Sequence, residues 1–329
     1  MALKKRIVVV GLGSIGRRHA RLLNQREDMA VEFCEPNRET LKEVFHEIGK
    51  LPAHTCYEDA LASRPDMVLI ATPTQLHCDQ TVRALRENIH VLCEKPMSDK
   101  LVDAIRMKDA SEHSSAVLSI GFMLHFHPGI TRLKQLIQEG VLGTVLHVRY
   151  LVGSYVTLAN SRSRYQSQLE GALLLDYAHQ PDIIYWLLRE RPRGVYMAAG
   201  HGGNMEFSSN PNFLTIVCDY DSPLLTTMDL NYLQMPQRHG CEIVGDEGWA
   251  LLDFEHGTLR IGNKKAASEV EEAVESTRDA VYQMEHQAFL DAVAGRREPS
   301  SPAEEAIVSM EILHAALNSW KRQQRVVLT

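Results

Sequence analysis

Two titratable side chains, Lys95 and His179, stand in sequence contexts that could place them at a reaction centre. Lys95 directly follows a predicted buried strand and precedes Pro96, which fixes a turn and permits a cis peptide bond. Ligands of open α/β sheets bind at the carboxyl ends of the strands, so this lysine can reach a bound cofactor. His179 lies three residues after Asp176, a carboxylate that can set the imidazole tautomer or hold a substrate. Such groups suit hydroxyl oxidation, because a base must take the hydroxyl proton as hydride leaves the carbon.

A glycine-rich turn follows the first predicted strand. Its glycines are Gly11, Gly13 and Gly16, with Ser14 and Ile15 between the last two. The first glycine allows a tight turn, the second lets a pyrophosphate approach the backbone, and the third lets helix and strand pack closely. Phosphates bound here would accept hydrogen bonds from free N–H groups at the positive end of the helix. The pattern predicts dinucleotide binding, and a purely structural glycine turn is the alternative.

The second predicted strand leads to Glu35, where a carboxylate can accept hydrogen bonds from the adenosine ribose hydroxyls. The same charge would repel a 2′-phosphate, so Glu35 favours NAD. Arg38 lies three residues on and would pair with such a phosphate if NADP were the cofactor. We expect NAD, keep NADP as the alternative, and retain Arg38 as a candidate cofactor-binding residue although a solvated helix position also explains it.

Short apolar runs alternate with amphipathic stretches through the first 121 residues, which predicts buried strands linked by helices. This alternation indicates an α/β fold whose N-terminal part is a doubly wound parallel sheet of the Rossmann type. The predicted strands are Ile7–Val10, Ala30–Cys34, Met67–Ala71, His90–Cys93 and Val117–Ile120. The predicted helices are Ser14–Gln25, Arg38–Gly49, His77–Asn88 and Ser98–His113.

After Gly121 the pattern changes, and longer strands succeed one another across short turns. Such a succession predicts a large, mostly antiparallel open sheet with helices on one face. We therefore expect a dinucleotide-binding Rossmann domain over residues 1–122 and a substrate-binding and oligomerisation domain over residues 123–329. The predicted strands are Val145–Val152, Val195–Ala199, Phe213–Asp219, Leu224–Asn231, Cys241–Gly245 and Trp249–Phe254. The predicted helices begin near His179 and cover Ser276–Ala294 and Pro302–Arg322.

Composition narrows the class of protein. Hydrophobic residues make up 44% and charged residues 23% of the 329 residues, the balance of a soluble globular chain. The net charge of −7 argues against nucleic acid or an anionic membrane as a partner. Six scattered cysteines predict buried thiols in a reducing cytoplasm and no metal centre. Because neither a signal peptide nor an apolar run of about 20 residues is present, we expect a cytoplasmic protein without a membrane segment.

Several further motifs combine with the glycine turn and the two titratable groups. They are Thr72-Pro73 with His77, Glu94-Lys95-Pro96, Gly121-Phe122, Phe126-His127-Pro128, Gly140–Gly143 and Asp176–Asp182. Together these motifs resemble the Gfo/Idh/MocA oxidoreductase family along nearly the whole chain. The resemblance implies NAD(P), a Rossmann domain, an α/β domain on an open sheet, and a sugar or cyclitol substrate.

The resemblance also implies roles for individual residues. Lys95 resembles the catalytic lysine of the family, His179 its general base and Asp176 its active-site carboxylate. Many members have the Asp and His four residues apart rather than three, so the role of Asp176 is open. Pro181 lacks an N–H and clashes within a helix interior, so a regular helix should begin no earlier than about Ala178. That start leaves His179 in the first helical turn, where the positive helix end favours a neutral imidazole.

A polar loop before this segment carries Arg162, Arg164 and Tyr165. Similar loops in relatives help to bind the substrate, and two guanidinium groups suit a carboxylate or a phosphate. A solvated loop without a binding role is the alternative.

We therefore expect an enzyme that moves a hydride between NAD(P) and a hydroxyl or keto carbon of a sugar, sugar derivative or cyclitol. An NAD-dependent glycosidase of the same fold and a non-catalytic nucleotide-sensing regulator are the alternatives. An exposed open sheet in such folds pairs with another subunit, so we expect a homodimer or a homotetramer. The expected cofactor-binding residues are Gly11, Gly13, Ser14, Ile15, Gly16, Glu35, Arg38, Thr72, Pro73, His77, Glu94 and Lys95. The expected substrate-binding residues are Lys95, Arg162, Arg164, Tyr165, Asp176 and His179.

Overall fold

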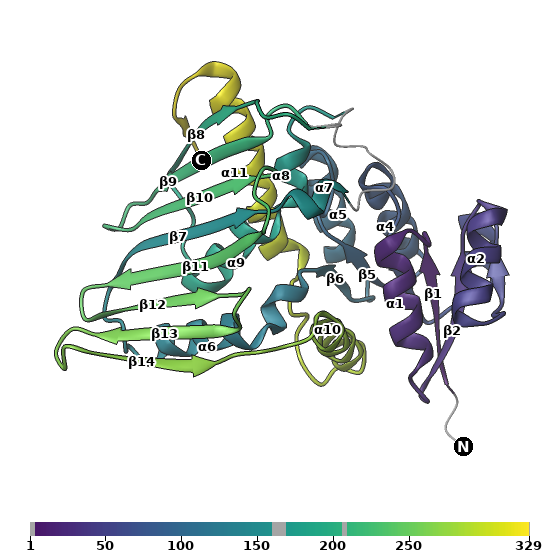
Figure 1. The fold of residues 1–329 in the computed structure, drawn as a ribbon. Helices are drawn as coiled ribbons and strands as arrows, with labels where there is room; N and C mark the ends of the chain where they lie inside the picture. The colour runs from purple at the N-terminus through teal and green to yellow at the C-terminus, as the bar shows by residue number, and fades with distance from the viewer. Residues whose placement is uncertain (1–3, 160–168, 206–208, 329) are drawn as a thin grey trace. The chain divides into compact units, whose positions relative to one another are not determined.

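The structure, a computed structural model, describes residues 4–159, 169–205 and 209–328. The chain packs as two compact units: Met1–Phe126 with Thr277–Met310, and His127–Ser276 with Glu311–Thr329. The division after Phe126 lies close to the boundary expected at residue 122. The return of Thr277–Met310 to the first unit is a feature that the strand–helix alternation does not indicate. Each unit is built around its own sheet (Figure 1).

The sheet of the first unit has six described strands in the order β3-β2-β1-β4-β5-β6, and all its pairings are parallel. The expected doubly wound parallel sheet is therefore confirmed. Chain order reverses between β1 and β4, and such a switch point opens a crevice for ligands at the carboxyl ends of the strands. The strands are β1 (Lys5–Val10), β2 (Met29–Cys34), β3 (Ala53–His54), β4 (Met67–Ile70), β5 (His90–Glu94) and β6 (Leu118–Gly121).

Helices link these strands, and two further helices from the end of the chain join the unit. β3 and α3 are absent from the sequence-based expectation because each is too short to show a period. The helices are α1 (Ser14–Asn24), α2 (Arg38–Ile48), α3 (Tyr57–Ala62), η1 (Thr74–Leu76), α4 (His77–Arg86), α5 (Leu101–Glu112), η2 (Met123–Phe126) and α10 (Arg278–Val293). The helix α11 (Ala303–Arg322) begins in the first unit and ends in the second.

The second unit contains a sheet of nine described strands in the order β14-β13-β12-β11-β7-β10-β9-β8-β15. Its pairings are antiparallel except for β7 with β10, so the expected mostly antiparallel sheet is confirmed. The strands are β7 (Val145–Gly153), β8 (Gly194–Gly200), β9 (Phe213–Asp219), β10 (Leu225–Asn231), β11 (Arg238–Gly245), β12 (Gly248–Asp253), β13 (Thr258–Asn263), β14 (Ser268–Ala273) and β15 (Val326–Val327).

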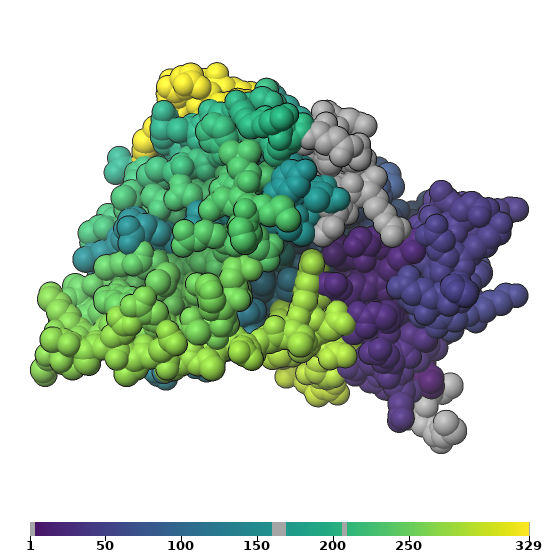
Figure 2. All heavy atoms as spheres, in the orientation of Figure 1, coloured from purple at the N-terminus to yellow at the C-terminus, as the bar shows by residue number. Residues whose placement is uncertain are grey.

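Alternate residues of β9 and β10 are buried, so one face of this sheet is packed and the other is open. On the packed face, α9 lies against β10 and α6 against β12. The edge strand β14 is mostly exposed (Figure 2). Its polar sequence Ser268–Ala273 carries no apolar alternation, which explains why the sequence did not predict it. The helices are α6 (Pro128–Gln138), α7 (Tyr155–Ala159), α8 (Ala172–Asp176) and α9 (His179–Leu188).

No helix within the described ranges has the length and apolar character that a membrane crossing requires.

The glycine turn after β1 depends on two close backbone approaches. Gly11 has a φ of +85°, and a Cβ there would lie 2.8 Å from the carbonyl oxygen of Ala71. A Cβ on Gly16 would lie 1.9 Å from the carbonyl oxygen of Gly11, so α1 packs directly on the turn. At Gly13 a Cβ would meet nothing within 4 Å. Two of the three glycines are thus required by packing, whereas Gly13 leaves space at the helix end.

We expect Gly16→Ala to lower the free energy of unfolding by about 2 kcal/mol or more, because its Cβ would push α1 off the turn. Gly13→Ala should leave the unfolding free energy within about 0.5 kcal/mol of the parent and weaken NAD binding instead. Urea unfolding and fluorescence titration with NAD measure the two effects. Equal destabilisation by both substitutions would contradict this assignment.

Candidate active site

The N-terminus of α1 carries the predicted phosphate site. Its N-cap is Gly13, and within the described residues no side chain caps the helix there and no acidic residue occupies its first turn. Ser14 is exposed and Ile15 half-buried, so the first helical N–H groups lie at the surface of this unit. Uncapped N–H groups, the positive helix end and the space beside Gly13 together fit a pyrophosphate.

Glu35 lies beside this turn at the end of β2. Its Oε2 accepts a hydrogen bond from the amide of Leu12 at 2.9 Å, and its Oε1 accepts one from the amide of Asn37 at 2.9 Å. The carboxylate is therefore fixed in place next to the glycine turn while staying half-buried. Arg38, the first residue of α2, is exposed. These positions agree with a ribose-facing Glu35 and a solvated Arg38, which stay predictions.

His77 joins the turns that follow β4 and β5. Its Nδ1 lies 3.0 Å from the carbonyl oxygen of Pro96 and its Nε2 lies 2.9 Å from that of Thr72. The ring is 1% exposed, and burial lowers the pKa of His77. Thr72 is half-buried and Pro73 is exposed at this edge of the sheet, and the Thr72 hydroxyl donates to Gln80 at 2.6 Å. His77 thus acts as a link between two backbone turns, and its predicted contact with the cofactor stays a prediction.

Lys95 follows the last residue of β5, and the Lys95–Pro96 peptide bond is cis, as the sequence suggested. The Lys95 amide donates to Oε2 of Glu94 at 3.1 Å, so the side chain of the preceding residue holds the turn. Burial opposes the charge on Glu94, but the hydrogen bond and charge of His19 hold the pKa of Glu94 below its usual range. Lys95 itself is half-buried, at the same sheet edge as the glycine turn.

The second unit holds the remaining titratable groups. Asp176 ends α8, and its Oδ2 accepts a short hydrogen bond from the hydroxyl of Tyr232. His179 begins α9 after the N-cap Ala178, so the helix start expected from Pro181 is confirmed. Asp176 and His179 therefore lie on two separate helices, and both are half-buried.

The candidate residues divide between the two units. The first unit carries the glycine turn, Glu35, the Thr72 turn and Lys95, and the second carries Asp176 and His179. Arg162, Arg164 and Tyr165 lie outside the described residues, so their expected role in substrate binding stays a prediction.

Sequence reasoning missed four residues around these groups. His19, Glu285 and His286 gather next to Glu94, and Tyr232 holds Asp176. Each of the four lies far in the sequence from the residue that it contacts, so these contacts have no local signal. His19 offered one clue, because it lies on the same face of α1 as the buried Gly16, Ala20 and Leu23.

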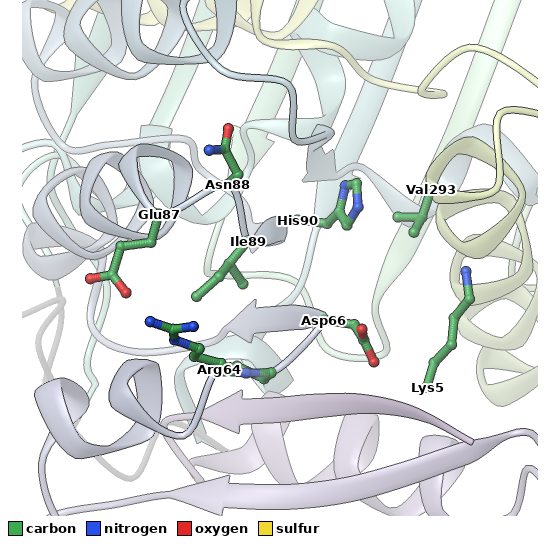
Figure 3. Close-up of a pocket in the computed structure, with 9 residues that line it drawn as sticks. Lys5, Arg64, Asp66, Glu87, Asn88, Ile89, His90 and Val293 are labelled. Atoms are coloured by element: carbon green, nitrogen blue, oxygen red, sulfur yellow. The ribbon is translucent and has the colours of Figure 1, made fainter. Parts of the chain in front are cut away.

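A hollow of the first unit lies at the opposite edge of the parallel sheet (Figure 3). Lys5 at the start of β1, Asp66 just before β4 and His90 at the start of β5 line it. Asp66 accepts a hydrogen bond from the amide of Arg6 at 2.7 Å, and His90 accepts one from the amide of Val117 at 2.9 Å. These side chains serve the strand ends, and the hollow is separate from the glycine turn at the other ends of the same strands.

Comparison with known proteins agrees with this arrangement. Residues 5–122 match the family described as an oxidoreductase family with an NAD-binding Rossmann fold. Residues 130–251 match the GFO/IDH/MocA C-terminal domain. The protein is therefore an oxidoreductase with an NAD-binding Rossmann domain, and the chain belongs to the Gfo/Idh/MocA family.

Individual relatives are about a quarter identical to this chain over the aligned residues. It is 27% identical over 279 residues to the 2,7-anhydro-N-acetylneuraminate hydratase of Escherichia coli (strain K12), covering 82% of this chain and 74% of that protein. It is 26% identical over 266 residues to an inositol 2-dehydrogenase of Corynebacterium glutamicum, covering 79% of this chain and 77% of that protein. The crystal structure of myo-inositol 2-dehydrogenase from Lactobacillus plantarum matches with a TM-score of 0.85, 19% identity, and coverage of 99% of this chain and 100% of that one. This last likeness supports the fold.

We expect Glu35→Ser to weaken NAD binding by about tenfold or more, because a charge-assisted hydrogen bond to the ribose is lost. NADP binding should stay the same or strengthen, since the repelling charge is removed. Fluorescence titration with both cofactors measures this, and Glu39→Gln, at an exposed site in the first turn of α2, serves as the matched control. Equal weakening of both cofactors by Glu35→Ser would instead show that Glu35 only supports the turn at Leu12.

Proposed function

We propose that this protein oxidises a hydroxyl carbon of a sugar, sugar derivative or cyclitol, or reduces the corresponding ketone, with NAD as cofactor. The observation that carries the proposal is the position of Lys95, on a cis turn at the carboxyl end of β5, the sheet edge that also bears the glycine turn. The inositol dehydrogenases among the relatives support a polyhydroxylated substrate.

In this reaction each of the proposed residues would have a separate role. Bound NAD supplies the hydride acceptor at its nicotinamide ring. His179 accepts the proton of the substrate hydroxyl, and the ammonium group of Lys95 stabilises the negative charge that develops on that oxygen. Asp176, held by Tyr232, orients the substrate. Overall, the substrate loses one hydride from carbon and one proton from oxygen, and a carbonyl group forms.

We expect Lys95→Met and His179→Ala each to reduce kcat by about 10²-fold or more. The unfolding midpoint should change little, since both side chains are half-buried rather than part of a packed core. Lys100→Met, which alters an exposed lysine five residues further on, serves as the control. Near-parental turnover in both active-site variants would overturn the assignment.

The substrate itself calls for a direct screen. Inositols, hexoses, sugar acids and nine-carbon acidic sugars should be offered with NAD while NADH fluorescence is followed. Acidic sugars belong in the set because the loop with Arg162, Arg164 and Tyr165 carries two guanidinium groups that suit a carboxylate.

A second candidate function is a reaction without net oxidation. The similarity to a 2,7-anhydro-N-acetylneuraminate hydratase favours it, because that name denotes addition of water to an anhydro sugar. The glycosidase alternative shares this property, since the hydride would be returned to the product. Conversion of an anhydro sugar or an aryl glycoside, followed by chromatography and without accumulation of NADH, would identify such a reaction.

The open face of the larger sheet supports self-association, and we propose a homodimer or a homotetramer in the cytoplasm. Tyr196 on β8, Phe213 on β9 and Leu225 on β10 are each 40% exposed. Apolar side chains on neighbouring strands are typical of surfaces that pair with another subunit. All six cysteines are free thiols, which suits a reducing compartment.

A further inference from the structure

Four buried titratable side chains of the first unit form a cluster next to the Lys95 turn. We call them the carboxyl–imidazole cluster: His19 on α1, Glu94 at the end of β5, and Glu285 and His286 on α10. Their exposed fractions are 0%, 7%, 3% and 1%. Groups of this kind are seldom buried without hydrogen-bond or charge partners, so the cluster needs a physical account.

Two imidazoles and one carboxylate form a hydrogen-bonded chain. Nε2 of His286 lies 2.7 Å from Nδ1 of His19, and Nε2 of His19 lies 2.8 Å from Oε1 of Glu94. The other oxygen of Glu94 accepts the amide of Lys95 at 3.1 Å. The chain thus ends on the backbone of the residue proposed to act in catalysis. A side chain at Gly121 would crowd Glu94, since its Cβ would lie 3.3 Å from Oε1.

Glu285 is the fourth member of the carboxyl–imidazole cluster, and it lies outside this hydrogen-bonded chain. One of its oxygens lies within 4.8 Å of the ligand atoms of His19 and Glu94. Among the described residues, neither oxygen of Glu285 has a hydrogen-bond partner. Two ionised carboxylates so close together and shielded from water would repel each other strongly.

The surrounding groups offer Glu285 little compensation. Tyr282 of α10 packs its ring edge-on against His19, with centroids 4.9 Å apart. Arg18 of α1 and Arg278 of α10 lie over that same tyrosine ring, at 5.7 and 5.9 Å. Arg26 pairs with Asp28 and Gln287. Burial, together with the charge of Glu94, raises the pKa of Glu285 well above its usual range.

We propose that Glu285 stays protonated in the folded protein and that the carboxyl–imidazole cluster, with Glu94 as its ionised member, positions the backbone of Lys95. The carboxyl groups of Glu94 and Glu285 differ in charge and in their contacts. Glu94 accepts hydrogen bonds from His19 and the Lys95 amide, whereas neutral Glu285 fills its place without adding a second negative charge. The effect of this arrangement on catalysis rests on the role proposed for Lys95. The charge states proposed for Glu94 and Glu285 do not depend on that role.

A bound divalent cation is the competing explanation, because one imidazole and two carboxylates also form a metal donor set. The two explanations require opposite charge states of Glu285. A cation needs an ionised carboxylate at this position, whereas the proposal needs a neutral acid, which glutamine resembles in shape and charge.

The first test compares thermal unfolding of the parent protein and Glu285→Gln across pH. A glutamate that keeps its proton when folded but loses it when unfolded weakens stability as pH rises above about 4.5. The variant lacks this penalty, so its Tm relative to the parent should increase by about 2 °C or more between about pH 5 and pH 8. Glu298→Gln, at an exposed site of the same unit, should show no such trend.

Two results would overturn the charge assignment. One is a Tm difference that stays constant or turns against Glu285→Gln as pH rises. The other is stoichiometric metal in the dialysed parent protein, measured by elemental mass spectrometry, that the variant has lost.

The second test addresses positioning and does not depend on turnover. Lys95 is labelled with an amine-reactive reagent at a series of pH values, and the labelled fraction is measured by mass spectrometry. The measured quantity is the pH at which half of this lysine reacts. We expect Glu94→Gln to move this midpoint down by about half a pH unit or more, because the variant removes a nearby negative charge. An unchanged or raised midpoint would show that no ionised Glu94 acts on Lys95 and would overturn the role of Glu94 in the cluster. A lowered midpoint together with parental turnover of Lys95→Met would refute only the catalysis proposed for Lys95.

Discussion

Two side chains hold the turn at Lys95, and the rest of the site depends on that restraint. The carboxylate of Glu94 binds the amide of Lys95, and His77 binds the carbonyl of Pro96. The same imidazole lies 2.9 Å from the carbonyl oxygen of Thr72, so its ring packs between the loops after β4 and β5. A flexible four-carbon side chain gains precision when its backbone is fixed in this way. The cis peptide therefore stands in a frame of hydrogen bonds from neighbouring strand ends.

The hydrogen bonds around the Lys95 turn are made by buried polar groups. Each of these groups is stabilised by the partners packed around it. His77 and His19 are both buried, but each ring nitrogen faces an oxygen or nitrogen partner. The close contact of Gly16 with Gly11 brings α1, and with it His19, onto the carboxyl edge of the sheet. The glycine turn thus has two consequences, since it leaves the first N–H groups of α1 without a side-chain cap and brings an imidazole to Glu94.

The local sequence pattern predicted most of the helices and strands of this protein. Alternating apolar runs predicted the parallel sheet and most of its helices, and Pro181 predicted the start of α9 at His179. The sequence did not predict β3, β13, β14 and β15. Of these, β14 is polar, and β3 and β15 have two residues each. The contacts of His19 and Glu94 with α10 depend on a chain return of well over a hundred residues, and no local period encodes such a return.

Hydride exchange between the substrate and NAD can be followed by transfer of an isotope. The hydroxyl compound that this protein accepts best should be prepared with deuterium on its reacting carbon and incubated with NAD. Hydride transfer should place one deuterium on the nicotinamide ring of the NADH formed, seen by mass spectrometry, and turnover should be slower than with the unlabelled compound. Unlabelled NADH, with the deuterium released to water, would contradict hydride transfer.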